Sequence, residues 1–408
     1  MQKINVFMYN LRKSGAGGTF RILRQTLLKN RRKSHKVKVC FFYQDKAVWD
    51  KSRPVYEAMK NDERFETFIL IIPNRDLQIS EEQYREISEH ENVICAQKPG
   101  SGEWFDLQKE KPDFIFLAKP YAILLPEGYW EGRLSGFTRL CYIPYGYQNW
   151  VLPIGLEKDF FRSIALFFAD DSYSKTEIVK QFPISSRLGI RKIFDFGYPS
   201  LASICTGKGM KDTPFWNEQE YKFKVMWTPR WTMDDECGGT HFFEYKDFFL
   251  HYFDLMPEAS LVFRPHPLAF HNWVETGQMT QKEVDEYLRY YEEHSNMYYD
   301  TCETYNATFW KSDVLVTDFS SIIVEYFVTK KPVIYCSKDL TIFNSYIRNI
   351  MNGCYLVSSE EELKKVLDGL KNGYDPLREK RHQLVDSLLA KHTEDTVNNI
   401  INAVWEAR

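Results

Sequence analysis

Two short apolar runs in the last third of the chain each end in a polar loop, and this pattern constrains the fold more than any other feature. Leu261–Phe263 leads into Arg264-Pro265-His266-Pro267, and Val314–Val316 leads into Asp318-Phe319-Ser320-Ser321. Runs this short predict buried strands. In an open parallel sheet both loops would lie at the carboxyl edge, where ligands bind. The pattern therefore predicts an α/β protein with a binding site at a sheet edge.

Strand-like and helix-like segments alternate along the chain, which is typical of parallel α/β sheets. The predicted strands are 4–9, 37–42, 67–72, 93–96, 114–117, 140–143, 164–168, 223–227, 260–263, 313–317 and 332–336. The predicted helices are 53–62, 80–90, 243–255, 281–293 and 321–329. This order favours two Rossmann-like domains, with parallel sheets facing a central cleft.

The domain boundary is predicted where the alternation stops. Residues 201–220 contain Gly207, Gly209 and Pro214 and show little periodicity, so they read as a linker. The predicted organisation is an N-terminal domain over 1–200, a C-terminal domain over 221–376, and terminal helices over 377–408.

The basic residues are concentrated at the N-terminus. Residues 1–44 hold eleven Lys or Arg and no Asp or Glu, so the rest of the chain has 53 − 11 = 42 basic against 56 acidic residues. Apolar residues recur there at roughly helical spacing, and such an acid-free amphipathic helix suits an anionic membrane surface. A core-packing helix with a basic outer face explains the pattern equally well. Nucleic acid is disfavoured because the remaining chain is acidic.

The cysteine pattern and the hydropathy of the chain predict a cytoplasmic protein without a membrane span. The eight cysteines are scattered, with no CxxC pair and no zinc spacing, so they read as reduced residues of a cytoplasmic protein. No signal peptide is predicted, and no run approaches the roughly 18 apolar residues of a membrane span. Asp234-Asp235-Glu236 reads as a solvated loop, and no metal site is predicted.

The serine loop has the residues of an anion site. Ser320 and Ser321 would open a helix whose free backbone N–H groups attract phosphate, and their hydroxyls would add hydrogen bonds. Asp318 would repel phosphate, so we expect it to cap the helix and hold the loop. Glu325, one turn further on, is a candidate for ribose hydroxyls. Taken alone, the loop is equally an ordinary capped helix start.

Two further strand ends add candidate ligands for a diphosphate. The prolines around His266 fix its backbone, and a protonated imidazole there could bind diphosphate oxygens. Arg264 could do the same or pair with an acidic neighbour. Thr228 and Arg230 follow another predicted strand and could line the same site. A histidine between prolines is also commonly structural.

Several of these segments together resemble a known family. They are Gly197-Tyr198-Pro199, Thr228-Pro229-Arg230-Trp231, Arg264-Pro265-His266-Pro267, the run 312–321, and Lys331-Pro332-Val333-Ile334. The string resembles the CDP-glycerol:poly(glycerol phosphate) glycerophosphotransferases, the teichoic-acid and capsule polymerases and primases, over about 195–340.

The resemblance implies a GT-B fold, a peripheral position at the cytoplasmic membrane face, and donor binding without a metal or other cofactor. It implies that His266 contacts or protonates the donor diphosphate and that Ser320 and Ser321 bind its phosphates. It also places Thr228 and Arg230 at the donor.

The chain departs from the family in its N-terminal domain. The family has His-Gly-Thr after a strand there, and the histidine is its general-base candidate. Here Tyr145 and Gly146 follow the predicted strand 140–143, so they take the catalytic and acceptor-side positions. Tyrosine, with a pKa of about 10, is a poor base at neutral pH. Positioning could suffice, the acceptor could differ, activity could be lost, or Tyr145 and Tyr147 could form a packed aromatic loop.

The predicted function is transfer of a phosphoalcohol, glycerol phosphate from CDP-glycerol, to a lipid-linked or cell-surface acceptor with release of CMP. The first alternative is a GT-B glycosyltransferase with a CMP-sugar donor, such as CMP-sialic acid or CMP-Kdo. The acidic-acidic-Gly base motif of those enzymes is missing from residues 1–200. The second alternative is a non-catalytic binding module of the same fold.

Overall fold

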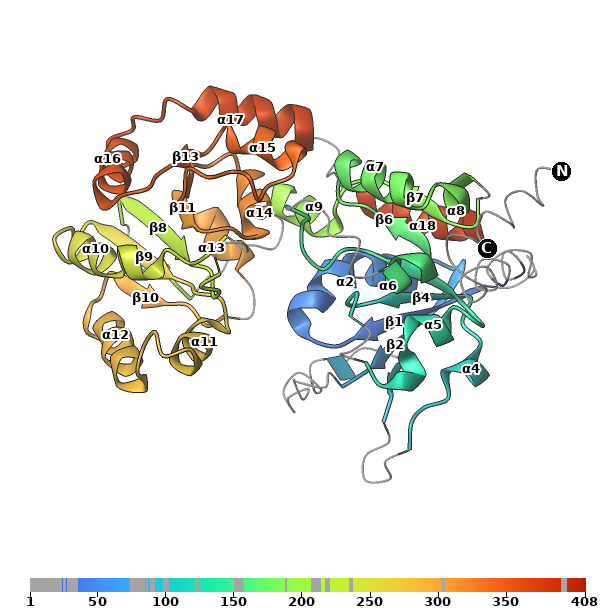
Figure 1. The fold of residues 1–408 in the computed structure, drawn as a ribbon. Helices are drawn as coiled ribbons and strands as arrows, with labels where there is room; N and C mark the ends of the chain where they lie inside the picture. Colours follow the sequence, from blue (N-terminus) through green and yellow to red (C-terminus); the bar gives the residue numbers. More distant parts are fainter. Residues whose placement is uncertain are drawn as a thin grey trace. The chain divides into compact units, whose positions relative to one another are not determined.

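The chain folds into two compact units, each built on a parallel sheet (Figure 1). The computed structural model describes residues 24, 27, 36–73, 85, 87–88, 92–97, 103–121, 125–149, 158–187, 189–206, 214–216, 221–234, 238–302, 305–389 and 395–408. The first unit comprises Met1–Gln148, Leu152–Ala202 and Lys391–Arg408, and the second comprises Asn149–Val151 and Ser203–Ala390. The predicted strand 4–9, most of the basic segment and most of the predicted helix 80–90 lie outside the described residues.

The first unit contains a seven-stranded sheet in the order β3-β2-β1-β4-β5-β6-β7, and every pairing is parallel. The strands are β1 (Val37–Tyr43), β2 (Phe65–Ile71), β3 (Val93–Cys95), β4 (Phe114–Leu117), β5 (Arg139–Tyr142), β6 (Ile164–Phe168) and β7 (Lys192–Phe194). Its helices are α2 (Lys46–Lys60), α4 (Leu107–Glu110), α5 (Glu131–Leu134), α6 (Lys158–Ser163), α7 (Ser172–Gln181), α8 (Pro183–Arg187) and α18 (Asp395–Ala407). The central strands are buried along their whole length, as expected for a parallel sheet covered on both faces.

Helix α2 starts seven residues earlier than predicted. In the predicted helix 53–62, Pro54 would stand in the first turn, where proline is favoured. Instead, the Asp45 side chain accepts a hydrogen bond from the Val48 N–H and caps the helix, and Pro54 lies inside it. The favourable cap and burial of Val55, Tyr56 and Met59 outweigh the backbone hydrogen bond lost at the proline.

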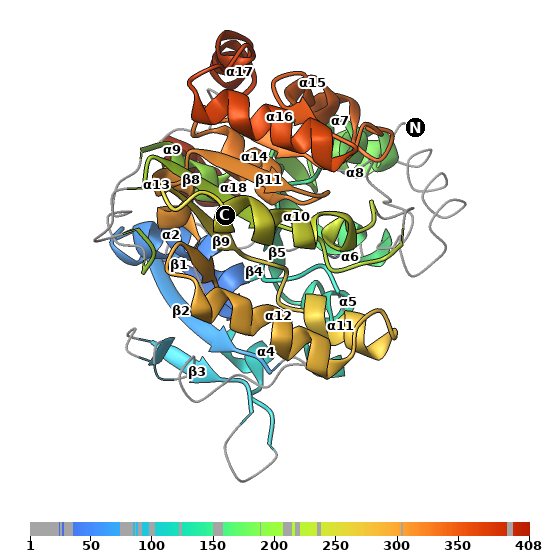
Figure 2. The ribbon, with the colours of Figure 1, turned by 90° about the vertical axis from the view of Figure 1, so that its left-hand side faces the viewer.

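The second unit contains a six-stranded parallel sheet in the order β10-β9-β8-β11-β12-β13. Figure 2 labels three of these strands, β8, β9 and β11. The strands are β8 (Phe223–Thr228), β9 (Ala259–Phe263), β10 (Met297–Tyr299), β11 (Val314–Thr317), β12 (Val333–Tyr335) and β13 (Tyr355–Leu356). The helices are α10 (Phe242–Asp254), α11 (Ala269–Glu275), α12 (Gln281–Glu293), α13 (Asn306–Lys311), α14 (Ile322–Phe327), α15 (Ser345–Met351), α16 (Glu360–Lys371) and α17 (Arg378–Leu384), which continues as a π-helical turn, Val385–Leu389. The predicted pair of parallel α/β sheets is confirmed.

An aromatic cluster fills one face of the second sheet. The Trp227 ring stacks on Phe249 with centroids 4.2 Å apart, and Phe242 stacks on Trp273 at 4.4 Å. Each of these four side chains is at most 1% exposed. This packing fixes β8 and α10, and with them the loop that follows β8.

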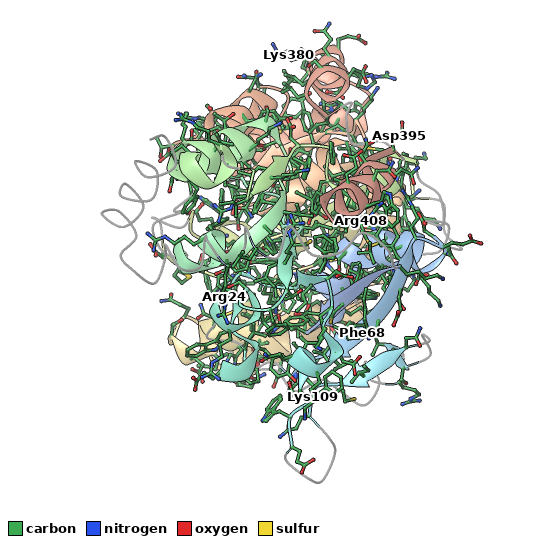
Figure 3. The ribbon with its side chains drawn as sticks, turned by 90° about the vertical axis from the view of Figure 1, so that its right-hand side faces the viewer. Arg24, Phe68, Lys109, Lys380, Asp395 and Arg408 are labelled. Carbon is green, nitrogen blue, oxygen red and sulfur yellow. The ribbon has the colours of Figure 1, made fainter. Side chains whose placement is uncertain are left out.

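The unit boundaries differ from the predicted linker and tail. The first unit passes into the second within α9 (Pro199–Thr206), between Ala202 and Ser203. The segment 377–408 divides, because α17 belongs to the second unit and α18 to the first. Figure 3 labels Asp395, the first residue of α18, and Arg408, the residue that follows the helix.

Candidate functional site

Three polar loops meet at the carboxyl edge of the second sheet because β9, β8 and β11 are adjacent in it. They are Pro229–Trp231 after β8, Arg264–Pro267 after β9, and Asp318–Ser321 after β11. The Arg264 N–H donates to the Trp227 carbonyl at 2.8 Å, and the His266 N–H donates to the Pro229 carbonyl at 3.4 Å. The sequence expectation that these loops share one edge is confirmed by the strand order.

Asp318 connects the loops of this edge. Its carboxylate is 1% exposed and accepts from the Arg230 N–H at 2.9 Å, from the His241 N–H at 3.2 Å and from His241 Nδ1 at 2.9 Å. The expectation that Asp318 holds the loop is thus supported. The expected helix cap is wrong, because Ser321 is the N-cap residue of α14 and no side chain caps the helix.

Arg230 links the β8 loop to the serine loop. Its Nη1 donates to the Phe319 carbonyl at 3.0 Å, its Nε donates to Thr232 Oγ1 at 2.6 Å, and its guanidinium lies 5.2 Å from the Phe319 ring centroid. The side chain is half-buried. It therefore places a fixed positive charge beside the Asp318–Ser321 loop.

The surroundings of His266 favour the neutral form of its imidazole. Partial desolvation of the ring, followed by the nearby charge of Arg230, lowers its pKa from 6.5 to about 4. The Leu268 N–H donates to Nδ1 at 3.2 Å, so Nδ1 is an acceptor and the single proton resides on Nε2. The sequence analysis expected a protonated imidazole beside a bound diphosphate, and that expectation stays a prediction. The ring is exposed and still offers an Nε2–H donor.

Arg264 and Glu325 are enclosed by other side chains. Arg264 Nη1 forms an ion pair with buried Asp300 at 2.9 Å, and its guanidinium lies 5.2 Å from the Tyr305 ring centroid. The Tyr305 hydroxyl donates to Glu325 Oε2 at 2.6 Å. Glu325 is 0% exposed, so a contact with ribose hydroxyls would require its side chain to become accessible, and this expectation stays a prediction. For Arg264, the alternative of an acidic partner is the one observed.

Thr228 is a sheet residue. Its side chain is 4% exposed, and its hydroxyl donates to Thr317 Oγ1 at 2.8 Å, while Thr317 donates back to the Thr228 carbonyl. The pair joins the ends of β8 and β11. The Thr228 hydroxyl is thus engaged within the sheet, and its expected contact with a donor stays a prediction.

The two serines are half-buried at the start of α14. The helix is six residues long, shorter than predicted, so the dipole at its start is small. Ser320 Oγ accepts from the Ile322 N–H at 3.3 Å, and the Ser320 carbonyl accepts from Asn149 Nδ2. The hydroxyl of Ser320 remains able to donate to a ligand.

Asn149 and His241 are site residues that the sequence analysis missed. Asn149 is 3% exposed and belongs to the second unit, where its carbonyl also accepts from the Asn344 N–H at 2.9 Å. His241 lies 77 residues before its partner Asp318. Neither residue stands in a strand-end motif. The one available signal for His241 was a histidine directly before the amphipathic segment 242–254.

Tyr145 and Gly146 lie in the first unit, after β5. The Tyr145 hydroxyl is 2.9 Å from the Tyr121 hydroxyl. Burial, and then Tyr121, raise the pKa of Tyr145 above its ordinary value, which disfavours proton abstraction by this side chain at neutral pH. Gly146 is half-buried, and its carbonyl accepts from Gln148 Nε2 at 3.3 Å.

A second carboxylate near this loop was also missed. Asp170, two residues beyond β6, is 0% exposed and accepts from the Gln148 N–H at 2.6 Å. Burial, and then neighbouring Asp171, raise the pKa of Asp170 from 3.8 to about 7. This side chain therefore fixes the end of the Tyr145 loop and titrates near neutrality.

Within the described ranges, no group of three or more His, Cys, Asp or Glu is placed to hold a metal ion. Among the described helices, none is long and apolar enough to cross a membrane.

Comparison with known proteins identifies relatives of this arrangement. The family described as CDP-glycerol:poly(glycerophosphate) glycerophosphotransferase matches residues 166–406, so the β9, β8 and β11 loops lie inside the match and Tyr145 outside it. No curated protein matches the chain.

Solved structures share the fold. A variant of the wall teichoic acid polymerase TagF is 16% identical, with a TM-score of 0.60, 99% of this chain covered and 96% of that chain. The UDP-GlcNAc 2-epimerase from Neisseria meningitidis, solved with UDP-GlcNAc, is 12% identical, with a TM-score of 0.58 and coverages of 91% and 99%. The epimerase from Methanocaldococcus jannaschii is 12% identical, with a TM-score of 0.53 and coverages of 81% and 92%. These likenesses confirm the predicted GT-B fold.

Proposed function

This chain belongs to the CDP-glycerol:poly(glycerophosphate) glycerophosphotransferase family, and from that premise we propose that it transfers glycerol phosphate from CDP-glycerol and releases CMP. The acceptor is a hydroxyl of a lipid-linked or cell-surface polymer of the teichoic-acid or capsule type. One observation supports the proposal: the loops that follow β8, β9 and β11 meet at a single sheet edge, and all three lie inside the family match.

The reaction is a phosphoryl transfer. The acceptor oxygen attacks the β-phosphorus, a new P–O bond forms, and the bond from that phosphorus to the bridging oxygen breaks, so that CMP leaves with the bridging oxygen. Such transition states are loose, and catalysis rests on positioning and on charge stabilisation. The hydroxyl proton can therefore leave late, to a phosphate oxygen or to water, and Tyr145 is not needed as a base.

His266, Arg230 and the serines would hold the diphosphate. Neutral His266 donates from Nε2–H, and the approaching negative charge favours its protonation as the leaving group develops charge. Arg230 supplies a permanent positive charge, and Ser320 and Ser321 donate hydroxyl hydrogen bonds. The proposed donor site takes no metal and no cofactor besides the CDP-activated substrate.

The test is CMP release from CDP-glycerol, with and without a chelator. His266→Ala should lower kcat/KM by roughly 100- to 1000-fold, the range for losing one donor to a developing charge. His271→Ala, an exposed histidine of the same unit, is the matched control and should retain activity.

Two outcomes would replace the proposal. Turnover of CMP-sialic acid without turnover of CDP-glycerol would make the protein a glycosyltransferase. Polymer synthesis unchanged by His266→Ala, in cells that depend on this gene, would make it a binding module.

We also propose a peripheral location at the cytoplasmic face of the cell membrane. The support is the acid-free segment 1–44 with its eleven basic residues. Substituting Arg31, Arg32 and Lys33 by Glu should reduce co-sedimentation with anionic vesicles, because juxtamembrane cations contribute about 1 kcal/mol each. Equal binding of variant and wild type would contradict this location.

A further inference from the structure

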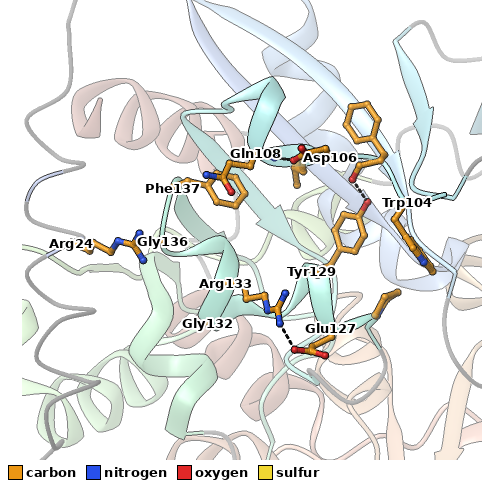
Figure 4. Close-up of a pocket in the computed structure, with 14 residues that line it drawn as sticks. Arg24, Trp104, Asp106, Gln108, Glu127, Tyr129, Gly132, Arg133, Gly136 and Phe137 are labelled. Carbon is orange, nitrogen blue, oxygen red and sulfur yellow. Dashed lines mark hydrogen bonds and ion pairs between the residues drawn. The ribbon is translucent and has the colours of Figure 1, made fainter.

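The first unit contains a cavity of about 830 Å³ that none of the strand-end loops lines. Its walls come from Trp104–Gln108, from the segment 126–137 and from Arg24 (Figure 4). Cavities of roughly 300–1000 Å³ are the usual size for small-molecule sites. All the residues that line the cavity belong to the first unit, so the second unit contributes nothing to it.

One wall of the cavity is a flat aromatic surface. The Trp104 side chain is 42% exposed, and its ring lies edge-on to Tyr129 with centroids 5.8 Å apart. The Tyr129 hydroxyl donates to the Phe105 carbonyl at 2.6 Å, which holds this pair in place. An exposed indole held in this way is a surface for the C–H face of a sugar or polyol.

Two of the glycines that line the cavity have different surroundings. A Cβ added at Gly128 would meet no atom within 4 Å, so a side chain there would occupy open space. A Cβ at Gly136 would lie 2.9 Å from Arg24 Nη1, so the guanidinium rests directly on the backbone of Gly136. These two positions leave room for a ligand and seat the arginine.

The other charged residues that line the cavity form ion pairs, whereas Arg24 does not pair with any described residue. Glu127 pairs with Arg133, and Asp106 Oδ2 lies 3.4 Å from Lys109 Nζ. Arg24 forms no ion pair with any residue in the described part of the chain. The lining thus offers one anion site next to carboxylates, which accept hydrogen bonds from hydroxyls.

We propose that this cavity binds a polyol phosphodiester, with the phosphate at Arg24 and the polyol against Trp104. Two sources share this chemistry. One is the poly(glycerol phosphate) chain, and this source rests on the proposed function. The other is the headgroup of phosphatidylglycerol, which does not depend on it.

The first experiment is calorimetric titration of the full-length protein with a soluble glycerol phosphate trimer. Arg24→Glu should weaken binding at least roughly tenfold, the size expected for a lost charge-assisted hydrogen bond. Arg289→Glu, an exposed arginine on α12 with the same charge change, is the control and should bind like the wild type. Gly128→Leu should abolish binding by filling the cavity, and an unchanged Tm would show that the variant is folded.

A second arm distinguishes the sources. Vesicles of phosphatidylcholine with and without phosphatidylglycerol are co-sedimented with the same proteins. Binding to the phosphatidylglycerol vesicles alone, sensitive to Gly128→Leu, assigns the site to the headgroup, and binding of the trimer assigns it to the polymer. Failure of the wild type to bind either probe, or binding unaffected by both Arg24→Glu and Gly128→Leu, overturns the proposal.

The readout separates this proposal from the proposed function. If the protein releases CMP from CDP-glycerol but binds neither probe at the cavity, only the proposed cavity site is rejected. Cavity binding without CMP release removes the transferase assignment and leaves the site.

Discussion

At the scale of single residues, His266 is held in one tautomer by its own loop. The Leu268 N–H occupies Nδ1, so Nε2–H is the group presented to solvent. A neutral donor binds a diphosphate without first competing for a proton. The bound phosphates then make protonation easier, which couples charge on the imidazole to occupancy of the site.

A titration of His266 tests this coupling. In the free protein its pKa should lie near the value of about 4 that partial desolvation and Arg230 impose. Adding CDP-glycerol or CMP should raise the pKa, because nearby negative charge favours the imidazolium. Nitrogen-15 NMR, assigned with His266→Ala, measures both. A free-state pKa at or above 6.5, or proton density on Nδ1, would contradict the tautomer assigned to the ring.

Asp170 gives the first unit a pH-dependent stability. Its pKa is raised from 3.8 to about 7, so the folded chain keeps a proton that the unfolded chain releases between these values. The free energy of unfolding should therefore fall as pH rises through that window. Asp170→Asn keeps an acceptor for Gln148 N–H and should stabilise the protein at pH 8 by on the order of 2 kcal/mol.

Urea unfolding at pH 5 and pH 8 provides the measurement. Asp106→Asn, an exposed helix cap in the same unit, is the control and should show no such gain. An equal effect of Asp170→Asn at both pH values would rule out the protonation account.

At the scale of elements, Lys331 ties the end of α13 to β12. Its buried Nζ donates to the carbonyls of Trp310 and of Ser312, the latter at 2.6 Å. Burial lowers the pKa of Lys331 to about 8, and nearby Asp313 opposes this shift. This gives a structural reason for the lysine of the Lys331-Pro332-Val333-Ile334 segment.

Replacing this lysine should therefore cost stability. Lys331→Met leaves buried carbonyls without a donor and should lower the free energy of unfolding by about 2–4 kcal/mol. Neighbouring Lys330→Met removes only a surface ion pair with Asp386 and should cost less than about 1 kcal/mol. Chemical denaturation of the two variants measures both free energies of unfolding. An equal loss of unfolding free energy in the two variants would refute a special role for Lys331.

The elements that sequence predicted well carry strong local signals. Helix α12 matches its predicted bounds because Thr280 and Glu283 form a capping box before an amphipathic run. The long central strands are continuous apolar runs. The short strands β7, β10 and β13 were not predicted, because two or three half-buried residues at a sheet edge leave little pattern.

The candidate site was predicted only in part, for a related reason. Strand ends reveal which loops share an edge, but they do not reveal long-range partners. The bond of Asp318 to Arg230 spans 88 residues, and the enclosure of Glu325 depends on Tyr305. Such pairings appear only when the chain is folded.

At the scale of the whole molecule, α18 returns the chain to its first unit. Arg64 Nη1 donates to Asn402 Oδ1 at 3.0 Å, Thr396 Oγ1 donates to the Phe196 carbonyl at 3.1 Å, and Phe65 meets Trp405 at 6.1 Å. The helix also packs against α2. The first unit is thus completed by residues that follow the entire second unit in sequence.

Removing 391–408 should consequently destabilise the first unit and spare the second. Hydrogen exchange is the suitable measurement, with faster exchange expected in β1, β2 and α2 and little change in β8, β9 and β11. Glu406→Gln, an exposed position on the same helix, is the control. Equal acceleration in both units would show that α18 stabilises the chain globally.

The late position of α18 also orders events during synthesis. Residues 203–390 are contiguous and can reach their native packing once they have left the ribosome. The first unit is incomplete until α18 has been synthesised, and part of its apolar sheet stays exposed until then. We therefore expect the second unit to reach its native packing before the first unit does. We also expect chaperones to bind the incomplete first unit for longer.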